Sequence, residues 1–317
     1  MNTALSMRLE RIQYACEQCS IFEFRAPHAD PPPAPAGAHV QIYLPDGNLR
    51  AYSVLNPDEP EPRYVVAVKH AAGSRGGSRW LHEHARVGMH FDILPPQNNF
   101  SLNEGASHSL LFAGGIGITP LWSMVQRLER LRASWKLIYG VRHHTDIVFA
   151  KELAALGDRV QFVFSRGQAS SRHIDFRSEL AAAPDGTHFY CCGPKSMMDA
   201  FESATAALGL PPQQCHVEFF TPREEAARGG DFIVHLARSG RSITVPAGLT
   251  ILDALLAQGI DAPRSCEQGV CGTCETRVLE GAPDHRDSVL SDSERSSNQT
   301  MMICCSGCLG SRLVLDL

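Results

Sequence analysis

The first hundred residues alternate short apolar runs with turn-forming residues. Runs rich in β-branched and aromatic side chains occupy residues 40–44 and 64–68, and such side chains favour strands. Two turn signals, Pro45-Asp46-Gly47 and Asn56-Pro57-Asp58, lie between these runs. Short strands separated by turns are typical of antiparallel barrels. We therefore expect a small antiparallel β-barrel in the N-terminal third of the chain.

The pattern then changes to apolar strands that alternate with helical stretches. The strands are expected at residues 109–113, 136–139, 160–164 and 187–191, and the helices at residues 119–131, 147–156 and 196–208. Strands that alternate with helices predict a parallel, doubly wound α/β sheet.

The last third of the chain follows a polar stretch that ends in two glycines, residues 221–230. Such a composition is typical of a linker. Beyond it we expect two strands at 232–236 and 241–245, a helix at 251–257 and a terminal strand at 313–317. The chain is therefore predicted to be multidomain, with domains at 1–103, 104–222 and 231–317 and a linker at 223–230.

Composition excludes several classes of protein. The net charge of −5 argues against nucleic acid as the main partner. The sequence lacks both a run of about 20 apolar residues and a signal-peptide pattern, so we expect a cytoplasmic protein without a membrane segment. Of the eleven cysteines, six follow residue 260. Because cytoplasmic thiols stay reduced, this excess indicates ligands and not a disulfide framework.

The cysteine cluster has the spacing of a plant-type [2Fe–2S] site. Cys266, Cys271 and Cys274 form C-x4-C-x2-C, and Cys304 follows after 29 residues. Gly269 lies inside this loop and allows its backbone to approach a cluster closely. The fourth ligand stays open, because Cys305 and Cys308 compete with the favoured Cys304. A zinc site that uses Cys305 and Cys308 is the less specific alternative. The run 284–294 is expected to be a solvated face near the cluster.

Two glycine-containing turns indicate a nucleotide site. The segment Gly114 to Pro120 (GGIGITP) follows one predicted strand and precedes a helix, whose N-terminus favours a pyrophosphate. Cys192, Gly193 and Pro194 follow another strand. Either turn alone is often a plain connection between elements. Both belong to the edge of the sheet where ligands bind in open α/β folds, so together they favour a dinucleotide.

A possible flavin site lies in the predicted barrel. Arg50, Tyr52 and Ser53 end a strand, where they can serve a phosphate and an aromatic ring. The segment Gly76 to Ser78 precedes a short predicted helix at 80–84, which offers a second phosphate-binding terminus. Each signal is weak when taken singly.

Together these motifs resemble the phthalate dioxygenase reductase family within the ferredoxin–NADP⁺ reductase superfamily, to which vanillate demethylase reductase is similar. The resemblance also rests on Ala36 to His39, Glu218 to Phe220 and the terminal segment 313–317. It implies an antiparallel β-barrel FMN domain at 1–103, an NAD(P)H domain at 104–222 and a β-grasp ferredoxin domain at 231–317.

The resemblance also implies roles for single residues. Arg50, Gly77 and Ser78 would contact the FMN phosphate, and Tyr52 and Ser53 the isoalloxazine. Thr119 and Cys192 would lie near the nicotinamide, and Phe220 would cover a flavin face. It thus makes Ser53, Cys192 and Phe220 the catalytic set. The other cofactor-binding residues that it implies are Lys69, Gly76, Gly114, Gly115, Gly117, Gly193, Pro194 and Glu218, and the wider superfamily adds Ser165 and Arg166 as contacts of a 2′-phosphate.

One departure concerns the cofactor. Relatives commonly carry acidic residues in the loop after the third nucleotide-domain strand, whereas this chain has Ser165 and Arg166. A guanidinium suits a 2′-phosphate. NADH is the default expectation, and NADPH is the alternative if Arg166 is more than a solvated side chain.

The implied activity is electron transfer. A hydride carries two electrons and a [2Fe–2S] cluster takes one, and a flavin bridges that difference. Electrons would pass from NAD(P)H to FMN, to the cluster and to a terminal Rieske oxygenase that acts on an aromatic compound. We expect a monomer. The rivals are a stand-alone diaphorase and a non-catalytic redox-sensing or zinc module. Cys16 and Cys19 are expected to be buried strand thiols.

Overall fold

The computed structural model describes residues 3–27, 30–45, 47–59, 61–70, 76–166 and 173–317. They form two units, Met1–Glu218 and Phe219–Leu317, and each is described by itself. No helix among the described residues has the length and apolarity needed to cross a membrane.

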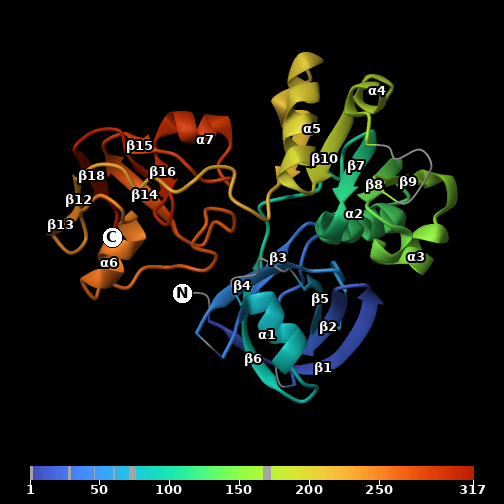
Figure 1. The fold of residues 1–317 in the computed structure, drawn as a ribbon, viewed down its shortest axis with the longest axis horizontal. Coiled ribbons are helices and arrows are strands. Elements are labelled where there is room, and N and C mark those ends of the chain that lie inside the picture. Colours follow the sequence, from blue (N-terminus) through green and yellow to red (C-terminus); the bar gives the residue numbers. More distant parts are fainter. Residues whose placement is uncertain (1–2, 28–29, 46, 60, 71–75, 167–172) are drawn as a thin grey trace. The chain divides into compact units, whose positions relative to one another are not determined.

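The N-terminal part of the first unit is a closed antiparallel barrel (Figure 1). Its six strands run in the order β4-β3-β6-β1-β2-β5. A bridge between Val54 and Val66 joins β4 to β5 and closes the barrel. The elements are β1 (Leu5–Cys16), β2 (Cys19–Arg25), β3 (His39–Tyr43), β4 (Leu49–Ser53), β5 (Arg63–Lys69), α1 (Gly77–His84) and β6 (His90–Gln97).

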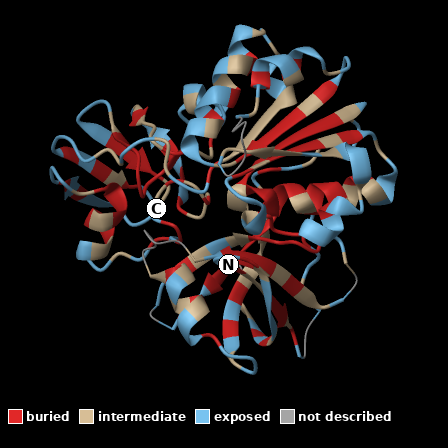
Figure 2. Cartoon of the chain, turned by 45° about the vertical axis from the view of Figure 1, so that its right-hand side comes forward, coloured by how far each residue is buried: buried red, intermediate tan, exposed pale blue. Residues whose placement is uncertain are grey.

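Apolar side chains that alternate along these strands fill the barrel. Phe22, Phe24, Ile42 and Ile93 are at most 1% exposed, and Phe24 meets Phe91 edge to face. The barrel therefore has a core of its own, visible as buried residues in Figure 2. Cys16 and Cys19 face each other across the β1–β2 turn and are buried, which confirms the expectation of buried strand thiols.

A five-stranded parallel sheet, in the order β11-β10-β7-β8-β9, makes up the rest of the first unit. Leu111 packs in a cluster with residues of α2, whereas the next residue, Phe112, packs on Phe176 of α4 and Phe201 of α5. Both faces of the sheet are thus covered, which explains the continuous apolar run in β7. The elements are β7 (His108–Gly114), η1 (Gly115–Gly117), α2 (Ile118–Leu131), β8 (Trp135–Val141), η2 (His144–Asp146), α3 (Ala150–Ala154), η3 (Gly157–Arg159), β9 (Val160–Phe164), α4 (Phe176–Ala181), β10 (Thr187–Cys192), α5 (Lys195–Ala207), η4 (Pro212–Gln214) and β11 (Cys215–Glu218).

Helix α2 connects the sheet to the barrel. Its Ser123 Oγ accepts a 2.9 Å hydrogen bond from the Gly37 N–H, and its Gln126 amide donates to the Leu55 carbonyl at 2.5 Å. Gly37 has φ +87°, and a Cβ there would collide with the Phe100 carbonyl. The helix that begins at the nucleotide turn is therefore fixed to the barrel. The predicted boundary at residue 103 stays a prediction.

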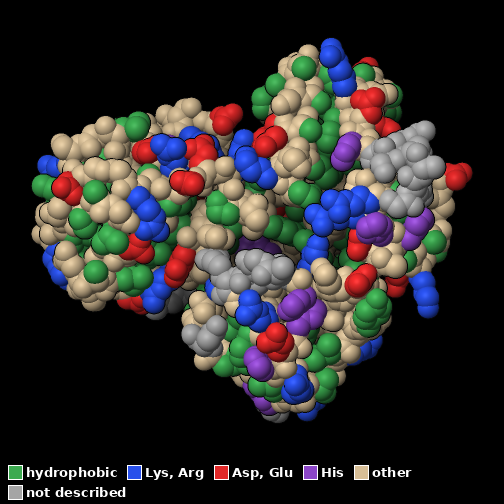
Figure 3. All heavy atoms as spheres, viewed as in Figure 1, with side chains coloured by type: hydrophobic (Ala, Val, Ile, Leu, Met, Phe, Trp, Pro, Cys, Tyr) green, Lys and Arg blue, Asp and Glu red, His purple; other side chains and the backbone are tan. Residues whose placement is uncertain are grey.

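The second unit is an α+β domain built on a mixed sheet in the order β13-β12-β18-β14-β16. The terminal strand β18 pairs in parallel with β12, and this pairing brings the two ends of the domain together. Acidic and basic side chains intermingle on the face seen in Figure 3. The elements are β12 (Phe232–Leu236), β13 (Arg241–Val245), α6 (Ile251–Ala257), β14 (Glu275–Glu280), β15 (Pro283–Asp284), α7 (Asp292–Ser297), β16 (Thr300–Met302), β17 (Gly307–Cys308) and β18 (Arg312–Leu315).

The polar segment before β12 contacts this unit. The Ala227 N–H donates to the Cys305 carbonyl at 2.7 Å, and Glu224 pairs with Arg286 at 2.8 Å. The chain between residues 223 and 230 thus has anchored positions although its composition is that of a linker.

Candidate functional site

The two glycine-containing turns lie at one edge of the parallel sheet. Because β7 and β10 are neighbours in register, Cys192 pairs with Ala113, and the turn after each strand meets the other. Gly193 would place a Cβ 3.2 Å from the Gly114 Cα. Glu218 ends β11 beside Cys192. The structure therefore brings together nucleotide residues that lie far apart in the sequence.

Close contacts with the second turn explain two of the glycines in the first turn. A Cβ on Gly117 would lie 2.5 Å from the Cys192 carbonyl carbon, and one on Gly114 would lie 2.6 Å from the Pro194 Cδ. The Tyr139 hydroxyl donates to the Gly115 carbonyl at 2.9 Å and so holds the turn. Side chains are excluded here, which leaves room for a pyrophosphate to approach the backbone of the two turns.

Cys192 and Glu218, the two titratable side chains at this edge, favour their uncharged forms. They therefore suit contact with a nicotinamide ring, and the Cys192 thiol is not a nucleophile. Burial, with Glu218 nearby, raises the pKa of the Cys192 thiol well above its usual range. Burial also raises the pKa of Glu218 to about 8, and its Oε2 atom has no hydrogen-bond partner among the described residues. A buried acceptor without a partner is typical of a ligand site, and an amide-bearing nicotinamide fits that description.

The barrel residues of the predicted flavin site also converge. Arg50 and Ser53 lie on β4, and Gly77 begins α1 so close to Arg50 that a Cβ would come within 2.8 Å of the guanidinium Nε. Burial raises the pKa of the Tyr52 hydroxyl, which is therefore neutral. The Thr119 hydroxyl lies 3.4 Å from the Ser53 hydroxyl and so joins this site to the nucleotide turn. A phosphate cradle beside a half-buried aromatic strand fits FMN.

Replacing Gly77 by alanine is expected to weaken flavin binding, because the new Cβ displaces Arg50 from the α1 terminus. A lost charge-assisted contact is worth about 1.5 kcal/mol, so the FMN dissociation constant should rise about tenfold. Fluorescence titration of flavin-free protein measures it. Arg86→Gln, which removes an exposed charge from the same barrel, is the control and should change nothing. Unchanged affinity in Gly77→Ala would refute the cradle.

Four buried cysteines converge in the second unit. Cys266, Cys271, Cys274 and Cys304 are at most 7% exposed. The side chain of Cys271 contacts that of Cys266, and the side chain of Cys304 contacts those of Cys266 and Cys274. No three His, Cys, Asp or Glu side chains in the described part of the chain surround a single metal ion. Four buried cysteines in mutual contact provide the ligand number that a [2Fe–2S] cluster needs.

The loop backbone is arranged to donate to these sulfurs. The N–H groups of Gln268 and Val270 point at the Cys266 Sγ from 3.3 and 3.5 Å, and the Thr273 hydroxyl lies 3.2 Å from the Cys271 Sγ. Gly269 and Gly272 have φ +68° and +79°, a conformation that glycine adopts readily. Sulfur donors with N–H partners fit a [2Fe–2S] cluster.

Geometry also separates the three candidates for the fourth ligand. Cys305 contacts Cys304, and its sulfur lies against Gly269 of the loop and turns towards the Met302 carbonyl, 3.7 Å away. Cys308 is half-buried and turns towards the Arg312 carbonyl at 3.6 Å. Of the three, Cys304 has the side chain that meets both Cys266 and Cys274, so the arrangement favours it.

Some predicted residues lie apart from these clusters. Ser165 and Arg166 continue the β8–β9 ladder at the same sheet edge, with Arg166 exposed. Lys69 is exposed at the end of β5, and Phe220 is 40% exposed at the start of the second unit. Their roles stay predictions. The loop after Arg166 includes Gly167 and Gln168, which lie outside the described residues.

The expectation of a solvated face over residues 284–294 is wrong at its centre. Asp287 is 1% exposed and accepts hydrogen bonds from the Val289 and Leu290 N–H groups. Sequence reasoning missed it because charged residues surround it in the chain. The available signal was the spacing of Asp287 and Leu290, because an acidic side chain can accept a hydrogen bond from the backbone N–H of an apolar residue three positions later.

Comparison with known proteins agrees with this geometry. The "2Fe-2S iron-sulfur cluster binding domain" matches residues 234–308, and the "Oxidoreductase NAD-binding domain" matches residues 111–203. Phenoxybenzoate dioxygenase subunit beta of Ectopseudomonas oleovorans is 52% identical, over 99% of this chain and 97% of that one. Tetrachlorobenzoquinone reductase of Sphingobium chlorophenolicum is 45% identical, over 99% and 98%.

The solved structure of phthalate dioxygenase reductase, described as modular for electron transfer from pyridine nucleotides to [2Fe–2S], is 34% identical. It superposes with a TM-score of 0.73 and covers 99% of this chain and 98% of its own. The chain belongs to the phthalate dioxygenase reductase family. As a phthalate dioxygenase reductase relative, it is an NAD(P)H-dependent oxidoreductase with a flavin and a [2Fe–2S] cluster. The predicted barrel, parallel-sheet and ferredoxin architecture is confirmed.

Proposed function

We propose that this reductase delivers electrons from NAD(P)H to a terminal Rieske-type oxygenase that acts on an aromatic compound. The observation that carries the proposal is the 52% identity, along nearly the whole of both chains, with a subunit of phenoxybenzoate dioxygenase. The bound flavin supplies the conversion of one hydride into two single electrons. The aromatic substrate binds to the partner oxygenase, so its identity cannot be inferred from the residues of this chain.

The roles proposed for the chain's own residues follow from their positions. Arg50 and the α1 terminus at Gly77 bind the flavin phosphate, and Ser53 with Thr119 orients the ring beside the nucleotide turn. The segment Gly114 to Pro120 binds the pyrophosphate. Glu218 accepts from the nicotinamide amide, which supplies the partner that its Oε2 lacks within the described chain.

Four cysteines complete the assignment as ligands of the cluster: Cys266, Cys271, Cys274 and Cys304. The supporting observation is that the four are buried together, with the Cys266 side chain against those of Cys271 and Cys304 and the Cys304 side chain also against that of Cys274.

Reconstitution tests the function directly. Purified chain should contain one FMN and two irons with two sulfides, and should support NADH-dependent turnover of a phenoxybenzoate-type dioxygenase component. Product formation per NADH oxidised is the measurement, and oxygenase without the reductase is the control. Full cofactor content without turnover of any aromatic-ring oxygenase would contradict the partner while leaving the redox chain intact.

A second acceptor is favoured by one observation. The relative named tetrachlorobenzoquinone reductase is 45% identical over nearly the whole chain, so a quinone is the alternative electron acceptor. The two candidate acceptors, an oxygenase and a quinone, are distinguished by the kcat/KM that the reductase has for each. Preference for a halogenated quinone over the oxygenase, by kcat/KM for each acceptor, would favour the stand-alone reductase.

Arg166 provides the test of cofactor preference. Its exposed guanidinium lies at the nucleotide edge after β9, where we propose that it contacts the 2′-phosphate of NADPH. Arg166→Ala should then lower kcat/KM for NADPH about tenfold, about 1.4 kcal/mol, and leave NADH unchanged. Arg142→Ala, which removes an exposed charge from the neighbouring strand end, is the control. No change with either nucleotide in Arg166→Ala would end the proposal and leave NADH as the cofactor.

We also propose that the chain works as a monomer in the cytoplasm. The eleven cysteines are free, and such thiol-rich chains persist in a reducing compartment. Sedimentation of the cofactor-loaded protein at micromolar concentration measures its mass. A dimer mass would overturn the first part of the proposal.

A further inference from the structure

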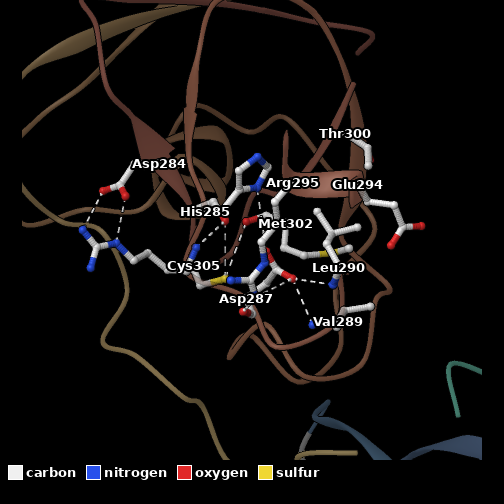
Figure 4. A network of polar contacts seen from close by, with 12 residues as sticks. Asp284, His285, Asp287, Val289, Leu290, Glu294, Arg295, Thr300, Met302 and Cys305 are labelled. Carbon is white, nitrogen blue, oxygen red and sulfur yellow. Dashed lines mark hydrogen bonds and ion pairs between the residues drawn. The ribbon is translucent and has the colours of Figure 1, made fainter. Parts of the chain in front are cut away.

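A buried polar network in the second unit joins residues outside the ligand set (Figure 4). Its centre is Asp287, whose side chain is fully buried. One carboxylate oxygen accepts from the Val289 and Leu290 N–H groups at 2.9 and 2.8 Å. The Arg295 guanidinium lies 3.9 Å from that oxygen and donates to the Asp287 carbonyl. His285 Nδ1 lies 3.9 Å from the second oxygen, which has no hydrogen-bond partner among the described residues.

This network contacts the loop between Cys266 and Cys271. The Ser288 N–H, next to Asp287, donates to the Gly269 carbonyl at 2.7 Å. Gly269 approaches so closely that a Cβ there would lie 3.0 Å from the Asp287 Cα. The residues on either side of Gly269 donate their N–H groups to the Cys266 Sγ. The position of Asp287 therefore fixes the peptides that contact a ligand sulfur.

Burial of this carboxylate has an electrostatic consequence. A charge taken out of water interacts with its surroundings more strongly than an exposed one. Burying a charge is costly unless a counter-charge lies nearby, as Arg295 does here at 3.9 Å. Charge and N–H bonds around the sulfurs are what set the reduction potential of an iron–sulfur cluster. A buried negative charge disfavours an added electron, whereas N–H donors to the sulfurs favour one.

We propose that Asp287 is a positioning residue of the [2Fe–2S] centre that acts in both ways. Its charge keeps the reduction potential low, and its hydrogen bonds hold the loop in the shape that presents N–H groups to Cys266. The inference rests on the proposed ligand set. It goes beyond that set because none of the atoms of Asp287 is a ligand.

Two substitutions separate the two effects. Asp287→Asn keeps an oxygen for the Val289 and Leu290 N–H groups, removes the charge and leaves Arg295 without its counter-charge. The cluster potential should therefore rise, with about a tenfold change in the ratio of reduced to oxidised cluster at a fixed ambient potential, which is 59 mV for one electron. Asp287→Ala also removes the acceptor, so the loop loosens and the iron and sulfide content should fall.

The matched control is Asp284→Asn. Asp284 lies in the same segment and loses the same charge, but it is half-buried and forms two hydrogen bonds with the Arg286 guanidinium, so the potential should stay at the wild-type value. Dye-mediated titration followed by the electron paramagnetic resonance of the reduced cluster gives the potential and the spectral signature. Iron and sulfide analysis gives the content, and thermal unfolding reports the fold.

The outcomes are distinct. A raised potential in Asp287→Asn, with wild-type iron content and an unchanged Asp284→Asn, supports the proposal. A potential equal to wild type in Asp287→Asn overturns it, and this variant carries the test even if Asp287→Ala fails to fold. Wild-type protein without iron or sulfide would overturn the proposed function itself, so the two failures are distinguishable.

Discussion

Replacing Cys304 by alanine is expected to remove the [2Fe–2S] cluster and with it electron delivery to the oxygenase. Loss of an outer residue of a metal site costs about 10–100-fold in affinity, and loss of a thiolate ligand exceeds that. NADH-dependent reduction of the oxygenase should fall more than about 100-fold. Reduction of ferricyanide, which needs the flavin alone, should stay near the wild-type rate. Iron analysis and the two rates measured side by side provide the test.

Cys305→Ala and Cys308→Ala are the matched controls for this prediction. Both residues follow Cys304 in the chain, but their sulfurs turn to the carbonyls of Met302 and Arg312. Each variant should keep its iron and its rate of oxygenase reduction. Retention of a full cluster in Cys304→Ala, with loss in either control, would move the fourth ligand to that residue and refute the geometric assignment.

The fourth ligand also shows where sequence reasoning reached its limit. The spacing of Cys266, Cys271 and Cys274 specifies a cluster type, because those cysteines belong to one local loop. Three cysteines within five positions compete for the remaining place, and spacing carries no information about which sulfur turns inward. That choice depends on how β16 enters the domain, a long-range feature of the fold.

The helices and strands show the same contrast between local patterns, which the sequence predicts well, and long-range contacts, which it does not. Strand β9, strands β12 and β13 and helix α6 have the predicted bounds, because their apolar period is set by nearby residues. The helix predicted at 147–156 shrinks to Ala150–Ala154. Phe149 has φ +62°, a conformation that ends helical continuity and that is rare for a bulky side chain. Its ring stacks on Trp122, so a tertiary contact overrides the local pattern.

Burial of a charged residue was the feature least accessible from the sequence. Asp287 stands among Asp284, Arg286 and Asp292, and such composition is typical of a solvated surface. Its burial follows from the Gly269 contact, which joins segments 18 residues apart. Two hydrogen bonds from the following backbone to one carboxylate oxygen of Asp287 offset part of the cost of that burial. The sequence predicted that Gly269 allows a close backbone approach in the loop, but it did not predict that Asp287 is the residue approached.

Gly117→Ala is expected to remove most nucleotide-dependent activity while flavin binding persists. A Cβ on Gly117 would lie 2.5 Å from the Cys192 carbonyl carbon and 2.8 Å from the Gly193 nitrogen. These are backbone atoms, so the two turns must separate. Overpacking of this kind costs about 1–3 kcal/mol, and we expect the KM for the nucleotide to rise at least about tenfold.

The physical reason is that both turns have to present their backbone to one dinucleotide. Gly117 leads into α2, and Cys192 precedes Gly193 at the end of β10, so a displacement of one turn moves N–H groups away from the pyrophosphate. Gly105→Ala is the control, because its Cβ would meet the Asn103 side chain at 3.4 Å. Steady-state kinetics with flavin content and thermal midpoint measured in parallel separate a binding defect from unfolding. A wild-type KM in folded Gly117→Ala would show that the spacing of the two turns does not control nucleotide binding.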